Sequence, residues 1–118
     1  MPGYERDTVQ LIEDLQAALA DLRAVTRSTE VTLRRALKMA KDGADVSTAL
    51  TATKPAETRQ AMNDALKAVE AARHQMRLRF FAEGLAQGMT IGNLGRIFGF
   101  SRQLAARYAK EARGIVST

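Results

Sequence analysis

The apolar residues of the first third of the chain recur every three or four positions. Between residues 6 and 41 they fall on one side of an α-helix, at Ile12, Leu15, Leu19, Leu22, Leu33, Ala36 and Ala40. This spacing is typical of an amphipathic helix and is close to the seam of a coiled coil. β-branched residues never alternate over four or more positions, as they do in strands. The chain is therefore expected to be all-α.

Two threonines, Thr26 and Thr29, fall on the same stripe. Polar residues on a seam weaken packing but can fix its register, and they could equally mark a break between two shorter helices. The end of the segment is clearer, because Lys38 and Lys41 suit a helix C-terminus. Gly43 can then adopt the left-handed conformation of a helix cap.

A second apolar stripe follows a short polar connection. Residues 45–54 predict either one helical turn, started by Asp45 or Ser47, or a loop, and Pro55 suits the first position of a helix. Neither Gly nor Pro then occurs before Gly84, which predicts a helix of about 30 residues. Its apolar face is formed by Met62, Leu66, Val69, Met76 and Phe80.

Two long helices joined by a short connection predict an antiparallel hairpin. Two helices enclose little core, so the remaining apolar surface favours a second copy of the chain. We expect residues 1–75 to form this hairpin and to hold two copies together as a homodimer. Residues 76–118 would form a second, functional region, and the second long helix would belong to both regions. The alternative is that the hairpin folds back on the C-terminal helices of its own chain.

The charge of the chain is distributed unevenly. Residues 1–66 carry nine basic and ten acidic residues, whereas residues 67–118 carry nine basic and three acidic residues. The net charges of these two parts are −1 and +6. A basic end on a near-neutral scaffold suits a polyanionic partner, although a cationic surface can also serve solubility alone.

The composition argues against several other kinds of site. There is no cysteine, which excludes disulfides and thiolate metal sites and suits a reducing cytoplasm. His74 is the one histidine and is expected on a helix surface, so neither a metal nor another cofactor is predicted. The sequence contains neither a nucleophile–base pair nor a phosphate-binding Gly-rich loop, so an enzyme is not predicted. No apolar run approaches the roughly 20 residues that span a bilayer, and the N-terminus lacks the apolar core of a secretory signal.

Two short helical patterns follow Gly88. Thr90 is a suitable N-cap for the first, whose apolar face is Ile91, Leu94 and Phe98. Ser101 is a suitable N-cap for the second. The residues of this helix that can face inward are Leu104, Ala105, Tyr108 and Ala112. Only Gly99 and Phe100 separate the two patterns, so the helices must cross steeply, as in a helix-turn-helix.

The stretch TIGNLGRIFGFSRQLAARYAK, residues 90–110, resembles the helix-turn-helix of bacterial transcription regulators such as the lactose-repressor and resolvase types. That family has a small residue where the two helices touch, a glycine four positions later, an apolar residue and then a small polar residue. Gly95, Gly99, Phe100 and Ser101 match these positions in turn. The sequence departs from the family in having glycine rather than alanine at 95, and Ala105 where a larger aliphatic residue is usual. The resemblance covers about 25 residues, a fifth of the chain.

Phe98 and Phe100 are expected to close a small core. The other predicted members are Phe80 or Phe81, Leu85, Ile91, Leu94, Leu104 and Tyr108. The alternative is that the rings lie in solvent and stack on the bases of a single strand.

The outward side of the second short helix carries Arg102, Gln103, Ala106 and Lys110, with Arg107 beside them. Arginine and glutamine can pair with guanine and adenine edges in the major groove, and a small Ala106 allows close approach. The resemblance places base contacts at the start of this helix, which implies Arg102, Gln103, Ala106 and Arg107. The expected phosphate contacts are Thr90, Arg96, Ser101, Lys110 and Arg113.

These features predict a small dimeric bacterial transcriptional regulator that binds double-stranded DNA in a sequence-specific way, in the cytoplasm and on the nucleoid. Each copy would insert the helix of residues 101–112 into the major groove, at half-sites about 34 Å apart. Two alternatives remain open. One is a helical adaptor for protein interactions, of an antitoxin-like or RNA-polymerase-associated kind, and the other is a plasmid or phage DNA-binding factor.

Overall fold

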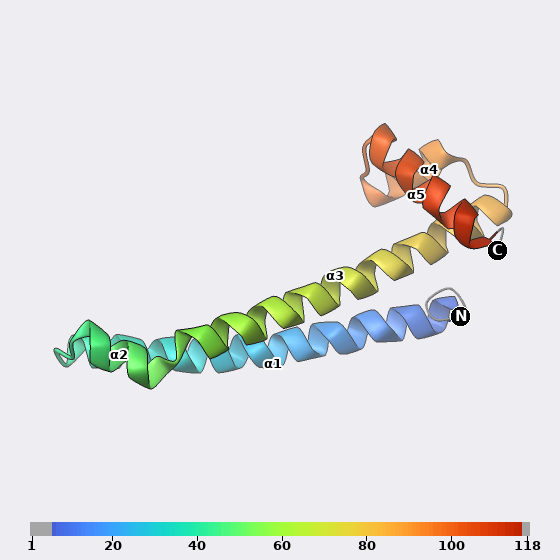
Figure 1. Ribbon diagram of the computed structural model, residues 1–118. Coiled ribbons are helices and arrows are strands. Elements are labelled where there is room, and N and C mark those ends of the chain that lie inside the picture. The colour runs from blue at the N-terminus through green and yellow to red at the C-terminus, as the bar shows by residue number, and fades with distance from the viewer. Residues whose placement is uncertain (1–5, 117–118) are drawn as a thin grey trace. The chain divides into compact units, whose positions relative to one another are not determined.

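The computed structural model describes residues 6–116, and the side chains of residues 6–114. This part of the chain contains five α-helices and no strand, which confirms the all-α prediction (Figure 1). The helices are α1 (Thr8–Lys41), α2 (Val46–Thr53), α3 (Pro55–Ala86), α4 (Ile91–Phe98) and α5 (Arg102–Val116). Residues 16–70 form one compact unit, here the central unit. Residues 6–15 and 71–116 form the other, the terminal unit.

Helix α1 is continuous through both threonines, so a break between two shorter helices is wrong. The Thr26 hydroxyl donates to the carbonyl of Leu22 at 2.8 Å, and the Thr29 hydroxyl donates to the carbonyl of Val25 at 2.9 Å. Each hydroxyl is thus satisfied within its own helix. Neither residue interrupts the helix, in which Thr26 is exposed and Thr29 is half-buried.

The helix ends of the central unit follow local sequence signals. Gly43 has a φ of 83°, and the amides of Gly43 and Ala44 bond back to the last turn of α1 at 3.1 and 3.0 Å. This is the predicted glycine cap. Asp45 caps α2 by accepting from the Thr48 amide at 2.8 Å. Hydrogen bonds from the side chain and backbone of Thr48 lower the pKa of Asp45. Helix α3 begins at Pro55, as predicted.

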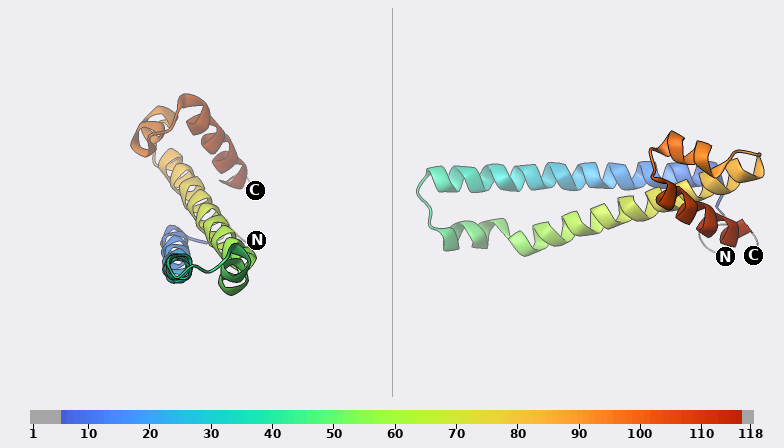
Figure 2. Two further views of the ribbon diagram at one scale, coloured as in Figure 1. Left: turned by 90° about the vertical axis from the view of Figure 1, so that its left-hand side faces the viewer. Right: turned by 90° about the horizontal axis from the view of Figure 1, so that it is seen from above.

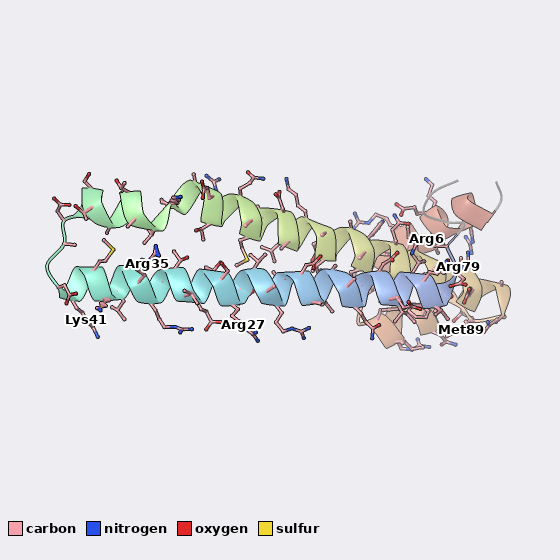
Figure 3. All side chains as sticks on the ribbon, turned by 90° about the horizontal axis from the view of Figure 1, so that it is seen from below. Arg6, Arg27, Arg35, Lys41, Arg79 and Met89 are labelled. Atoms are coloured by element: carbon pink, nitrogen blue, oxygen red, sulfur yellow. The ribbon has the colours of Figure 1, made fainter. Side chains whose placement is uncertain are left out.

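In the central unit, α1 and α3 run in opposite directions on either side of the α2 connection (Figures 1 and 2). Arg35 points toward α2, where its guanidinium donates to the carbonyl of Ala52 at 3.3 Å, whereas Arg27 points the opposite way (Figure 3). The less exposed side chains recur at alternating intervals of four and three residues. They are Ala18, Leu22, Val25, Thr29, Thr32, Ala36 and Met39 on α1, and Thr58, Met62, Ala65 and Val69 on α3.

The predicted apolar stripe of α1 is therefore only partly buried. Leu22 and Ala36 are half-buried, whereas Leu19 and Leu33 are exposed. The reason is geometric, because the apolar residues of α1 cover a wider sector of the helix than a single neighbouring helix can bury. The exposed part of the stripe is a separate surface of the central unit.

The terminal unit joins the first turns of α1 to the last turns of α3. The Thr8 hydroxyl donates to the Glu83 carboxylate at 2.7 Å, and the Arg79 guanidinium donates to the same oxygen at 3.0 Å. Together, and in that order of importance, these two donors lower the pKa of Glu83 from its ordinary value of 4.5.

We expect this carboxylate to make the stability of the terminal unit depend on acidity. A lowered folded-state pKa means that the stabilisation is complete above about pH 4.5 and is lost as the pH falls through the folded value. In unfolding titrations between pH 7 and pH 2, Glu83→Gln should therefore lose stability at neutral pH and little at pH 2. Thr8→Val should show the same convergence, and equal losses at both pH values would contradict the assignment.

Candidate nucleic-acid interface

The core of the terminal unit is built around the ring of Phe81, which is fully buried. Its centroid lies 5.6 Å from that of Phe98, 6.0 Å from that of Phe100 and 5.4 Å from that of Tyr108. The predicted aromatic core is confirmed, with Phe81 rather than Phe80 as its buried member. Phe98 and Phe100 are partly buried and pack against this core, as predicted, rather than extending into solvent as base-stacking rings would.

All four predicted aliphatic members of this core are present as well. Leu94 is buried, and Leu85, Ile91 and Leu104 are partly buried against it. The core also includes residues that the sequence analysis did not assign to it. These are Leu78, Ala82, Met89 and Ala109.

Both short helices begin at the predicted residues, and α4 ends at its C-cap, Gly99, as predicted, whereas α5 continues to Val116, beyond the predicted residues 101–112. The hydroxyls of Thr90 and Ser101 accept the amides of Asn93 and Leu104 at 3.0 and 3.1 Å, which caps α4 and α5. Gly99 has a φ of 72°, and the amide of the next residue, Phe100, donates to the carbonyl of Gly95 at 2.8 Å. This pattern is a Schellman cap, and it places Phe100 against the core as the chain turns into α5.

Helices α4 and α5 touch at Gly95 and Ala105. A Cβ atom added to Gly95 would lie 3.0 Å from the Cβ of Ala105, closer than ordinary van der Waals contact. Both residues are buried. The two departures from the family pattern thus meet in one contact, where two small residues allow close helix packing. Tyr108 occupies neighbouring core space, with its ring centroid 5.0 Å from that of Phe100.

Helix α5 is also tied to α3 through His74. One ring nitrogen of His74, Nδ1, lies 3.1 Å from the Tyr108 hydroxyl, and the other, Nε2, lies 2.8 Å from the Glu111 carboxylate. His74 has the surface position expected for it, since 44% of its side chain is exposed, but its ring also joins two helices, which was not predicted. The missing information was its partner, which lies 34 residues away along the chain.

The two sides of α5 differ in burial and charge. Its inner side is buried, at Ala105, Tyr108, Ala109 and Ala112. The outer side, here called the cationic face, consists of Arg102, Gln103, Ala106, Arg107 and Lys110, all exposed. The predicted base-contact residues therefore lie together on one surface. Arg113 is exposed in the last turns of the same helix.

Three of the predicted contacts surround one groove between α4 and α5. Arg96, Ser101 and Arg102 line it together with Ile91, Gly92, Gly95, Phe100 and Ala105, and its volume is about 570 Å³. The Arg96 guanidinium is held by the Asn93 side chain. Arg107 does not line this groove. It lines a small hollow together with His74, Leu104, Tyr108 and Glu111. Thr90 is the N-cap of α4 and directly precedes Ile91 and Gly92 of the groove.

Arg77 is a cation near this surface that the sequence analysis did not single out. It comes from α3, and its guanidinium carbon lies 5.2 Å from the centroid of the Phe100 ring, next to the start of α5. The available signal was its position one helical turn before Phe81, which places both residues on the side of α3 that faces the core. Arg77 therefore adds positive charge beside the turn between α4 and α5.

Among residues 6–116, no three His, Cys, Asp or Glu side chains are grouped so that they could hold a metal ion. No helix in the same part of the chain combines the length and the apolar character needed to cross a membrane. Comparison with protein families, with curated proteins and with solved structures finds no match to this chain.

Proposed function

We propose that this protein binds double-stranded DNA as a homodimer and regulates transcription in a bacterial cell, where it would associate with the nucleoid. In this proposal α4 and α5 form a helix-turn-helix, and the cationic face of α5 enters the major groove. The central unit belongs to a long antiparallel hairpin of α1 and α3 that carries the dimer contact.

The observation that carries the proposal is the two-sided character of α5. Three of its alanines, Ala105, Ala109 and Ala112, are buried with Tyr108 against α3 and α4. Arg102, Gln103 and Arg107 remain exposed on the opposite side. A helix held by one side, with a cationic outer side, has the form that fits a major groove. Only Glu111 offsets the five cations between Arg96 and Arg113, and its carboxylate is engaged with His74.

The neighbouring groups suit contacts with the DNA backbone. A hydroxyl that accepts an amide, as those of Thr90 and Ser101 do, can still donate its own hydrogen to a phosphate oxygen. Arg96 and Arg102 supply positive charge at the groove between the helices. Phosphate contacts of this kind fix the position of a protein on the duplex, and base contacts supply the sequence preference.

Selection of bound duplexes from a random pool, followed by affinity measurements on single-base variants of the selected site, tests this function. Arg102→Ala should lose discrimination at one base pair, by about 1–3 kcal/mol. Arg113→Ala should instead weaken binding to all sequences alike. Arg27→Ala, which removes an exposed arginine of the central unit, is the matched control and should leave binding unchanged.

Two outcomes would reject the proposal. One is unchanged duplex binding by both Arg102→Ala and Arg113→Ala. The other is the absence of any binding to random duplex at low salt, which would favour a protein-interaction adaptor instead.

A further inference from the structure

The central unit exposes large aliphatic side chains in a regular pattern. On α1, Leu19 is 46% exposed, Leu33 62% and Leu37 55%, and on α3 Leu66 is 46% exposed. Each follows directly after a buried or half-buried residue of the α1 and α3 pattern described above, at Ala18, Thr32, Ala36 and Ala65. The exposed leucines therefore lie one residue further along each helix than the less exposed residues, with three of them on α1 and one on α3.

The exposed leucines of α1 and of α3 lie on the same side of the helix pair. One residue further along an α-helix is a rotation of about 100° around its axis. Because α1 and α3 run in opposite directions in this unit, this rotation, starting from the facing side of each helix, leads to the same side of the pair (Figure 1). Leu19, Leu33 and Leu37 of α1 and Leu66 of α3 thus lie on one face of the pair, here called the leucine face.

The α1 part of the leucine face is symmetric along the sequence. Leu19 and Leu33 lie seven residues on either side of Thr26, and Arg23 and Glu30 lie between them on the same stripe. If a second α1 packs antiparallel with Thr26 at the two-fold axis, Leu19 meets Leu33 of the partner subunit. Arg23 then comes close to Glu30 of the partner subunit. A parallel arrangement would instead place Arg23 beside Arg23 of the partner subunit, which is unfavourable.

Thr26 itself is compatible with burial at such an axis. Its hydroxyl donates to the Leu22 carbonyl at 2.8 Å, so packing would leave no unpaired donor. Its remaining surface is a methyl group. Burial of a satisfied hydroxyl costs far less than burial of an unsatisfied one.

We propose that the leucine face binds a second copy of the chain, with the two α1 helices antiparallel and Thr26 at the two-fold axis. The inference makes specific the dimer of the proposed function, and it does not depend on DNA binding. An isologous interface requires that one surface be complementary to itself, and this stripe has that property in both its leucines and its charges.

Disulfide trapping tests the arrangement, because the chain contains no cysteine. Single variants Leu19→Cys and Leu33→Cys, one of them tagged, are oxidised separately and as a mixture without DNA. The antiparallel dimer should give a cross-linked heterodimer of the two variants and little cross-linking of either alone. Thr26→Cys should cross-link with itself, whereas Ser28→Cys, exposed on a different side of α1 at nearly the same level, should not. Cross-linking of Leu19→Cys with itself, or equal cross-linking of Ser28→Cys, would overturn the proposal.

Exchange of charges gives a second measurement that does not require cysteines. Arg23→Glu or Glu30→Arg alone should weaken the dimer by roughly tenfold in sedimentation equilibrium, since each variant creates two repulsive pairs. The double variant should restore most of the affinity. A monomeric wild-type chain, or a double variant no tighter than the single variants, would refute the interface and leave the DNA titrations of the proposed function to be judged separately.

Discussion

Replacement of Phe81 by alanine is expected to unfold most of the terminal unit. The ring is fully buried and contacts the rings of Phe98, Phe100 and Tyr108 within 6.0 Å between centroids. Truncation of a buried phenylalanine to alanine costs about 3–5 kcal/mol, because apolar burial is lost and a cavity remains. A unit of this size has only a few kcal/mol of stability in total. The population of folded terminal unit should therefore fall sharply.

Two spectroscopic signals distinguish this outcome from a general loss of structure. Helical circular dichroism should fall only in part, since the central unit does not use Phe81. In a Tyr4→Phe background Tyr108 is the sole tyrosine, so its near-ultraviolet signal reports the terminal core directly. Ile97→Ala is the matched control, because Ile97 belongs to α4 but is 68% exposed. Equal destabilisation by the two variants would show that Phe81 does not hold this core.

The helix ends of this fold were predictable because their causes are local. The glycine cap at Gly43, the start of α3 at Pro55 and the hydroxyl caps at Thr90 and Ser101 each depend on residues within about one helical turn. The exposed positions of α5 were predictable for the same reason. Once Ala105 and Tyr108 face inward, helix geometry alone places Gln103 and Lys110 outward.

The remaining features depend on partners that are distant in the sequence. Phe80 and Phe81 differ by about 100° around α3, and only the positions of α4 and α5 decide which ring is buried. The bond between His74 and Glu111 spans 37 residues, so no local pattern could reveal it. The stripe of α1 showed which side is apolar but not how much of it α3 would cover. Its uncovered leucines, Leu19 and Leu33, belong to the leucine face.

Salt is expected to weaken DNA binding by about a thousandfold between 50 and 200 mM. Arg96, Lys110 and Arg113 in each of two copies would neutralise about six phosphates, and each neutralised phosphate releases condensed counterions. The logarithm of the binding constant should then fall with the logarithm of the salt concentration at a slope of about −5. The titration is made by fluorescence anisotropy on a random-sequence duplex, so that base readout does not contribute.

Lys110→Ala tests where this slope comes from. The variant removes one exposed cation of the cationic face from each copy, so the slope should become shallower by about 2. Arg27→Ala removes the same charge from the central unit and should leave the slope unchanged, because that side chain is not part of the cationic face. If both variants change the slope alike, binding follows the net charge of the chain rather than the surface of α5. If Lys110→Ala reduces the slope and Arg27→Ala does not, the phosphate contacts lie on α5, the helix that its buried alanines and the aromatic core hold in place.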